Sequence, residues 1–149
     1  MENTIVTLKK GEGRSFKQGG LWIYDNEIAT IKGRFKNGHF VEVHDYNDYP
    51  LGIGYINQDS KIRVRMLSRN VQQEMNDAFF KMRLAHAWQY RKDTVDTSSC
   101  RIVFGEADFL PGLVIDKFED VLVIQALTLG MDLLKERLVK LMKEVLQED

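Results

Sequence analysis

Cysteine, histidine and proline are scarce in this chain of 149 residues, which contains one, three and two of them. A single cysteine excludes an intramolecular disulfide framework and a zinc site built from several cysteines. His39 and His44 are five residues apart in a strand-like stretch, so their side chains should point to opposite faces. The sequence therefore predicts no disulfide and no bound metal.

Long apolar runs and nucleotide-binding motifs are also missing. No run approaches the ~18 residues that cross a bilayer, and the opening MENTIVTLKKGEG lacks the apolar core of a signal peptide. Gly11 and Gly13 are not followed by the third glycine, or the lysine, and the long helix that a phosphate-binding loop needs. We therefore expect a cytoplasmic chain without membrane contact and without a nucleotide or S-adenosylmethionine pocket of its own.

Apolar residues make up 44% of the chain and charged residues 29%, which is typical of a folded globular protein. The net charge of −1 is divided unevenly, because residues 1–70 carry a net +3 and residues 71–149 a net −4. This asymmetry favours a polyanion as the partner of the N-terminal part.

Four short stretches in the first 70 residues have the alternation of strands, and turn sequences separate them. They are residues 4–10, 38–45, 51–57 and 61–67. Short strands at this spacing predict a small β-barrel, and the intervening residues 11–20 predict a loop or a single helical turn closed by glycines. Gly52 and Gly54 share one face of a strand, which indicates tight curvature or a close backbone neighbour.

The apolar spacing changes at Asn70 from two residues to 3.6, and Asn70 is a good N-cap for a helix over 70–92. Two apolar stripes follow: Met75, Phe79, Met82 and His86, and Phe80, Leu84, Ala87 and Trp88. His86 continues the first stripe, so it is interpreted as a packed, hydrogen-bonded core histidine.

Three strands and a helix are predicted in the remainder. Residues 101–105, 112–116 and 121–127 are rich in Val, Ile and Leu, as is typical of strands covered on both faces. Residues 131–149 form an amphipathic helix with Leu134, Leu138, Leu141 and Val145 on its apolar face. The predicted fold class is α+β, with a barrel over 1–70 and a helix, three strands and a helix over 71–149. Because no glycine or proline closes the last helix, the natural chain is expected to continue.

Glu106 and Asp108 are the candidates for acid–base chemistry. In an extended segment their side chains would share one face at about 6.6–6.8 Å, within the range of paired carboxylates in glycoside hydrolysis. The alternative is a hairpin loop whose carboxylates accept hydrogen bonds from turn amides. Cys100 has no base beside it in sequence, and Arg101 should point to the opposite strand face, so a nucleophilic cysteine is not expected.

Basic and aromatic residues of the first 70 positions form the more coherent set. Arg63 and Arg65 alternate with apolar residues, so both should project from one face of a strand. Aromatic side chains close by in sequence could stack on bases. The candidate RNA-binding residues are Lys9, Lys10, Arg14, Lys17, Trp22, Arg63 and Arg65.

The order of motifs resembles the S-adenosylmethionine-dependent 23S (large-subunit) ribosomal RNA cytosine-C5 methyltransferase family. The resemblance spans nearly all 149 residues and is carried by KKGEGRSFKQGGLWIYDNEI, LGIGYINQDSKIRVRML, FFKMRLAHAWQYR and RIVFGEADFLPGLVIDKF. It is most specific at GEAD-x-LPGL-x-x-D and extends to Gly19, Trp22 and Ile23 and to Ser60, Ile62 and Arg65. One departure is Phe109, where the family usually has glycine.

The resemblance implies a PUA domain over 1–70, a small RNA-binding β-barrel, and an intermediate domain over 71–149. It also implies that the Rossmann methyltransferase domain, its S-adenosylmethionine and its catalytic residues lie outside this chain, which alone should be inactive. Ribosomal RNA and the catalytic domain are then the expected partners. The loop of Glu106, Asp108, Pro111 and Gly112 would pack on the catalytic domain or line its cleft.

Two other interpretations stay open from the residues alone. The chain could be a freestanding PUA-like module that binds RNA, or another protein including a second copy of itself, without methyltransferase activity. It could also be a small hydrolase that uses Glu106 and Asp108, which predicts turnover with a bell-shaped pH profile.

Overall fold

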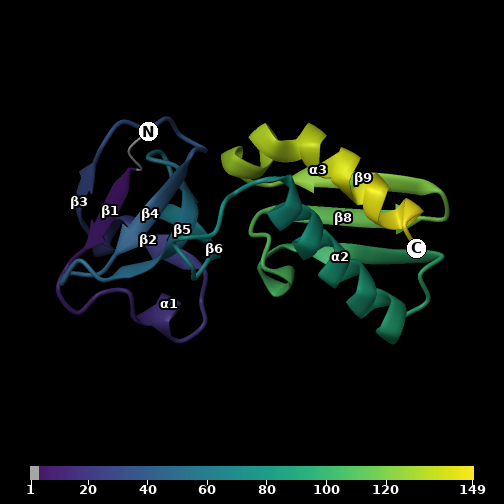
Figure 1. Ribbon diagram of the computed structural model, residues 1–149, viewed down its shortest axis with the longest axis horizontal. Coiled ribbons are helices and arrows are strands. Elements are labelled where there is room, and N and C mark those ends of the chain that lie inside the picture. The colour runs from purple at the N-terminus through teal and green to yellow at the C-terminus, as the bar shows by residue number, and fades with distance from the viewer. Residues whose placement is uncertain (1–3) are drawn as a thin grey trace. The chain divides into compact units, whose positions relative to one another are not determined.

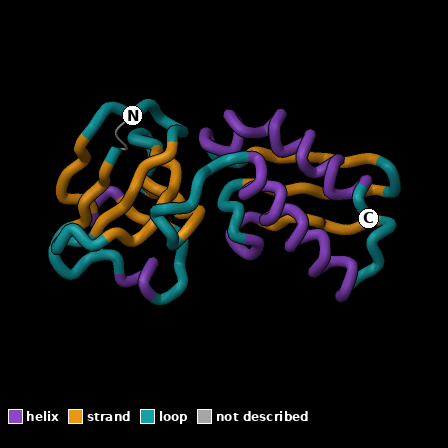
Figure 2. Tube along the Cα trace, in the orientation of Figure 1, coloured by secondary structure: helices purple, strands orange, loops and turns teal. Residues whose placement is uncertain are grey.

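A computed structural model describes residues 4–149 (Figure 1). The chain divides into two compact units, Met1–Gln73 and Glu74–Asp149. The boundary lies three residues beyond the division at 70/71 that the sequence suggests. Each unit has its own sheet, as the strands of Figure 2 show. In the described part of the chain, no helix has the length and apolar character needed to cross a bilayer.

The first unit is a curled sheet of six strands in the order β2-β6-β5-β4-β1-β3. The pairing is mixed, because β1 runs parallel to β4 and every other pair is antiparallel. The sheet forms a half-barrel with β2 and β3 as its edges. Its elements are β1 (Ile5–Leu8), α1 (Arg14–Lys17), β2 (Trp22–Tyr24), η1 (Asp25–Glu27), β3 (Ile28–Lys32), β4 (Phe40–His44), β5 (Pro50–Ile56) and β6 (Ile62–Ser68).

Alternation along the strands buries one side of this sheet. Val64 and Met66 of β6 point into the core, beside Ile23 of β2. Gly52 and Gly54 let β5 approach β6 closely, since a Cβ at Gly54 would stand 2.3 Å from the Arg65 carbonyl oxygen. The close backbone neighbour inferred from these two glycines is therefore β6.

The second unit is a three-stranded antiparallel sheet in the order β7-β8-β9, with α2 and α3 side by side on one face. Its core is formed where the apolar faces of the two helices meet the sheet, and Leu84, Ile102, Leu113 and Leu138 are fully enclosed there. The elements are α2 (Asp77–Thr94), β7 (Ser99–Phe104), η2 (Gly105–Asp108), β8 (Leu113–Phe118), β9 (Val121–Ala126) and α3 (Leu129–Gln147).

The α+β class and the main elements predicted from the sequence are confirmed. All four apolar positions expected of α3 are buried. The start of α2 was predicted wrongly, because Asn76 and not Asn70 is the N-cap. The Asn76 side chain accepts a hydrogen bond from the Phe79 amide at 3.0 Å, whereas Asn70 closes a turn before the helix by accepting from the Gln72 amide.

Two further expectations were wrong, and two strands were not predicted. His86 and Met82 are exposed, because the buried stripe of α2 passes through Phe80, Leu84 and Ala87 instead. Strands β2 and β3 were missed, since three and five residues beside turn sequences give too short a periodic signal. The second sheet is not covered on both faces: Phe118, Val121 and Val123 are exposed on the face away from the helices.

Candidate nucleic-acid interface

Edge strand β2 and its neighbour β6 bring arginine and aromatic side chains together on the first unit. Trp22 and Arg65 are direct partners across the two strands. The Arg65 guanidinium lies 5.1 Å from the centre of the Trp22 ring, and Tyr24 meets the same ring edge-on at 6.3 Å. This geometry places a cation over one ring of an aromatic pair, an arrangement that can take both a phosphate and a base.

The indole Nε1 of Trp22 is enclosed and has no acceptor among the residues that the structure describes. A buried donor without an acceptor costs about 1–3 kcal/mol. Because this nitrogen is enclosed, any contact of Trp22 with a ligand would come from the ring and not from Nε1.

Helix α1 continues the basic surface toward the glycine-rich loop. Arg14 and Lys17 are exposed on this single turn, and the preceding Lys9 and Lys10 are exposed at the end of β1. Phe16, on the same turn, is buried and anchors α1 to the core. All four lysine and arginine residues that were proposed for this loop and helix are therefore on the surface.

Arg63 differs from Arg65 although both leave β6 on the same face. The Arg63 guanidinium lies 3.6 Å from the Asp25 carboxylate and donates to Gln58 Oε1 at 2.6 Å, while its Nε donates to the Ser60 carbonyl at 3.1 Å. These contacts partly neutralise Arg63 and hold it against the β5–β6 turn. The charge that Arg63 can offer to an anion is therefore partly compensated within the chain.

The sequence reasoning missed Arg69 as a basic residue of this surface. Its guanidinium stacks 3.9 Å above the Phe16 ring and donates to the carbonyls of Phe16 and Gly20 at 2.7 and 3.1 Å. Arg69 therefore fixes α1 and the start of β2 to the end of β6. Arg69 continues the alternate positions of Arg63 and Arg65, which could have indicated that it belongs to the same strand face. The apolar Leu67 interrupts this series of arginines, so the pattern was not recognised.

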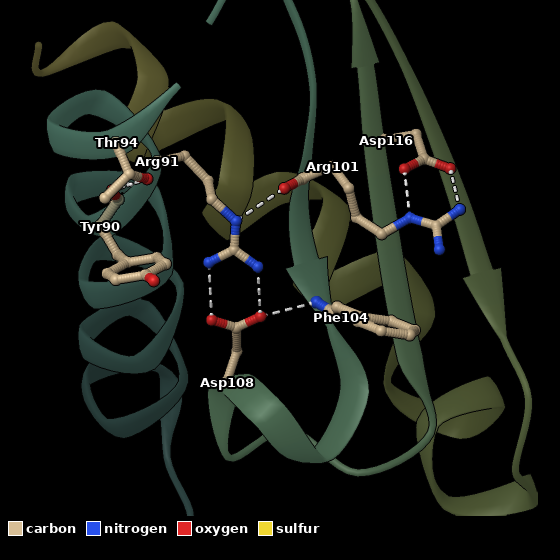
Figure 3. A network of polar contacts seen from close by, with 7 residues as sticks. All are labelled: Tyr90, Arg91, Thr94, Arg101, Phe104, Asp108 and Asp116. Carbon is tan, nitrogen blue, oxygen red and sulfur yellow. Dashed lines mark hydrogen bonds and ion pairs between the residues drawn. The ribbon is translucent and has the colours of Figure 1, made fainter. Parts of the chain in front are cut away.

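The loop of Glu106 and Asp108 lies in the second unit and is helical, not extended. Both carboxylates belong to η2, which ends at Phe109 in the left-handed region with φ 59°. Asp108 accepts two hydrogen bonds from Arg91 of α2, at 2.9 and 2.8 Å, and one from the Phe104 amide at 2.7 Å (Figure 3). The hydrogen bond to Asp108 raises the pKa of Arg91.

Glu106 accepts a hydrogen bond from the Gly112 amide at 3.2 Å, so it holds the far side of the same loop. Gly112 has φ 88°, and a Cβ there would lie 2.5 Å from Thr128 Oγ1; Pro111 beside it is buried. The premise of two carboxylates on one extended face was wrong. The hydrogen bonds of Asp108 and Glu106 described above join the loop to itself and to α2, which favours the hairpin-loop alternative over acid–base chemistry.

The remaining nucleophile and metal candidates are not assembled into a site. Burial raises the pKa of the Cys100 thiol, which disfavours the nucleophilic thiolate. His44 lies between Glu42 and Asp48, and His39 is exposed. Within residues 4–149, no group of three His, Cys, Asp or Glu side chains is placed to hold a metal ion.

Comparison with known proteins finds relatives that cover both units. The PUA-like domain family matches residues 6–69. Ribosomal RNA large subunit methyltransferase I of Pseudoalteromonas atlantica is 33% identical over 141 residues, which is 93% of this chain and 36% of the relative. The chain corresponds to the PUA-containing N-terminal portion of this methyltransferase family. The same enzyme of Alteromonas mediterranea is 33% identical over 147 residues, and that of Shigella dysenteriae 29% over 148 residues.

The chain thus spans 36–37% of the length of these curated relatives. Two solved structures share its fold with a TM-score of 0.80 each, at 15% and 16% identity. One is a candidate SAM-dependent methyltransferase from Streptococcus mutans, covering 96% of this chain, and the other is a candidate methyltransferase complexed with SAH, covering 99%. The chain covers 38% of each of them. The family expected from the sequence motifs is confirmed.

Proposed function

We propose that this chain binds and positions ribosomal RNA for an S-adenosylmethionine-dependent cytosine-C5 methyltransferase whose catalytic domain is not among these residues. The observation that carries the proposal is the β2–β6 edge, where Arg65 lies over Trp22 and Tyr24 flanks it. The relatives named as ribosomal RNA methyltransferases support the choice of RNA. Ribosomal RNA is a cytoplasmic partner in bacteria, so we place the chain in the cytoplasm.

Electrostatic attraction would bring the RNA to the first unit. The exposed Lys9, Lys10, Arg14 and Lys17 supply charge that is not specific for sequence. Trp22 and Arg65 would then hold an unstacked base and its phosphate, since base–aromatic stacking is worth about 1–3 kcal/mol per base. The RNA would be oriented by these contacts so that its target base can leave the stack for methylation elsewhere.

The residues of this chain do not fit the methyl donor itself. A Rossmann site for S-adenosylmethionine needs a parallel strand, a glycine-bearing turn and a helix in succession. In the part of the chain that the structure describes, the second sheet is antiparallel throughout, and the one parallel pair, β1 with β4, belongs to the half-barrel. In this proposal a Rossmann site for the methyl donor would come from another domain, and no catalytic step is assigned to this chain.

Fluorescence anisotropy of a labelled large-subunit ribosomal RNA fragment tests the proposal. The slope of log K against log salt should be roughly −3 to −5 for four to six phosphate contacts. The double variant Arg14→Glu/Lys17→Glu should weaken binding strongly. The matched control is Lys32→Glu/Lys36→Glu, because Lys32 ends β3 at the opposite edge of the sheet and both lysines are exposed. Equal loss in both double variants, or no RNA binding in dilute salt, would refute the proposal.

A second candidate function is protein binding through the open face of the second sheet. Phe104, Phe118 and Val121 are each more than half exposed there. Apolar surface of this kind marks interaction sites when it is contiguous. An RNA-binding curve that does not respond to salt would favour protein binding over RNA binding. A homodimer in analytical sedimentation that Phe118→Lys converts to monomer would favour it as well.

A further inference from the structure

Arg83 is the exception among the four arginines of the second unit. Arg91, Arg101 and Arg137 each form an ion pair, with Asp108, Asp116 and Asp77 respectively. Arg83 donates from Nη1 to the carbonyl oxygen of Phe109 at 2.7 Å, and no carboxylate among the described residues pairs with it. A guanidinium cannot lose its charge at physiological pH, so Arg83 is a cation whose counter-ion must come from elsewhere.

Two phenyl rings surround this guanidinium. The ring centres of Phe79 and Phe109 lie 4.6 and 5.6 Å from the Arg83 carbon that carries the charge. Phe79 is buried in α2, whereas Phe109 is 56% exposed. Burial also lowers the pKa of Arg83. The charge is therefore partly shielded from water, which strengthens its attraction for an anion compared with a solvated lysine.

Phe109 itself occupies a backbone conformation that disfavours its side chain. Its φ of 59° is in the left-handed region, which a bulky residue rarely adopts and glycine adopts freely. Its amide donates to the Glu106 carbonyl at 3.0 Å, and the following Leu110 is fully buried, so the backbone is fixed from both sides. The ring does not contribute to the core, and strain that the core does not require is concentrated at functional sites.

We propose that Arg83 and Phe109 form a nucleotide-binding platform on the second unit, with a single-stranded RNA base stacked on the exposed Phe109 ring and its phosphate bound by Arg83. This site rests on the proposed RNA-binding function and adds a contact outside the PUA-like unit. The pairing suits a nucleotide because the ring supplies a planar face while Arg83 Nε and Nη2 donate to no other described residue. An apolar peptide would leave the Arg83 charge without a counter-ion.

The substitution Phe109→Gly separates binding from folding, since glycine suits the backbone at this position. In anisotropy titrations of the full chain with fluorescein-labelled oligoadenylate, it should weaken binding about 5- to 150-fold, the range for loss of one stacked base. Its salt slope should stay that of the wild type. Arg83→Gln should instead make the slope shallower by about 1, and Phe109→Trp should retain the affinity.

Two variants serve as matched controls in the same titration. Tyr90 is 61% exposed, similar to Phe109, but its neighbouring Arg91 is already paired with Asp108; Tyr90→Ala should change the affinity less than about twofold. Lys140→Gln removes one exposed charge from α3 and should also have little effect. Circular dichroism melting of each variant verifies that the fold is retained, and Phe109→Gly should melt no lower than the wild type.

The outcomes distinguish this site from the proposed function. If Arg14→Glu/Lys17→Glu weakens RNA binding while Phe109→Gly does not, the PUA-like unit binds RNA and the platform is refuted alone. If the wild-type chain binds no RNA, both the proposed function and the platform are refuted. If polyglutamate competes as well as oligoadenylate and Phe109→Gly has no effect on either, Arg83 attracts acidic chains in general and the assignment to a nucleotide is wrong.

Discussion

Replacing Asp108 with alanine should destabilise the second unit by about 2–4 kcal/mol, because Arg91 would lose its partner in an enclosed position. The two side chains are 9% and 13% exposed, and they form the bidentate pair that joins η2 to α2. The same carboxylate also accepts from the Phe104 amide at 2.7 Å. The substitution therefore breaks three hydrogen bonds that converge on one side chain.

The magnitude follows from two opposing contributions. Removing one partner of a buried ion pair costs about 3–5 kcal/mol, and the unpaired Phe104 amide adds to this loss. Arg91 keeps the hydrogen bond from its Nε to the Arg101 carbonyl at 2.8 Å, and its remaining exposure lets water reach the guanidinium. These two effects reduce the expected loss to the lower range given above.

Urea unfolding followed by tryptophan fluorescence can measure this loss of stability in the second unit alone. The chain has two tryptophans, Trp22 on β2 and the buried Trp88 on α2. In a Trp22→Phe background, the remaining fluorescence reports the second unit alone, which avoids treating two units as one transition. A double-mutant cycle with Arg91→Met then isolates the coupling, since removing both charges should be less costly than removing one.

The exposed pair of Arg101 and Asp116 is the matched control, because the Arg101 side chain is 47% exposed. Asp116→Ala should cost clearly less than Asp108→Ala. If the two substitutions are equally mild, or if Asp108→Ala is milder than about 1 kcal/mol, the pair does not hold the loop as described and Asp108 is again available for another role.

Further predictions concern single residues in both units. Burial lowers the pKa of His44, but its hydrogen bonds to Asp48 and Glu42 outweigh this and raise the pKa above 6.5; the resulting stability is complete below about pH 6.5 and is lost as the pH rises through the folded-state pKa, and pH-dependent melting of His44→Gln should lack this loss. Gly112→Ala should destabilise the second unit by about 1–3 kcal/mol, because φ is 88° and the new Cβ would meet Thr128; urea midpoints test this. Asn76→Ala should cost about 1 kcal/mol and Asn70→Ala less, since Asn76 caps α2; the same denaturation assay compares them.

Elements with long, regular apolar spacing could be predicted from the sequence, and those defined by tertiary contacts could not. The four apolar positions of α3 repeat for several turns, so its buried face was readable. The start of α2 was ambiguous because Asn70 and Asn76 are both good caps, and Phe79 and Phe80 decide between them by packing in the core. His86 continued a sequence stripe in which Phe79 alone is buried.

The candidate site shows the same limit. Alternation along β6 predicted that Arg63 and Arg65 share a face. It could not show that Arg63 contacts Asp25 and Gln58, or that Arg65 lies over Trp22. These partners come from other strands and turns, and β2 was not recognised as a strand. Likewise, the sequence distance between Arg91 and Asp108 gives no indication that they pair.

The glycine at position 54 links the interior of the half-barrel to its outer edge. With no side chain there, strand β5 rests directly against the backbone of Arg65, whose guanidinium lies over Trp22 on the other side. Any larger residue would have to displace that carbonyl, and with it the backbone that carries the Arg65 side chain. A requirement for the contact between Arg65 and Trp22 would therefore also restrict the buried position 54. Gly54 should tolerate substitution poorly, even by alanine.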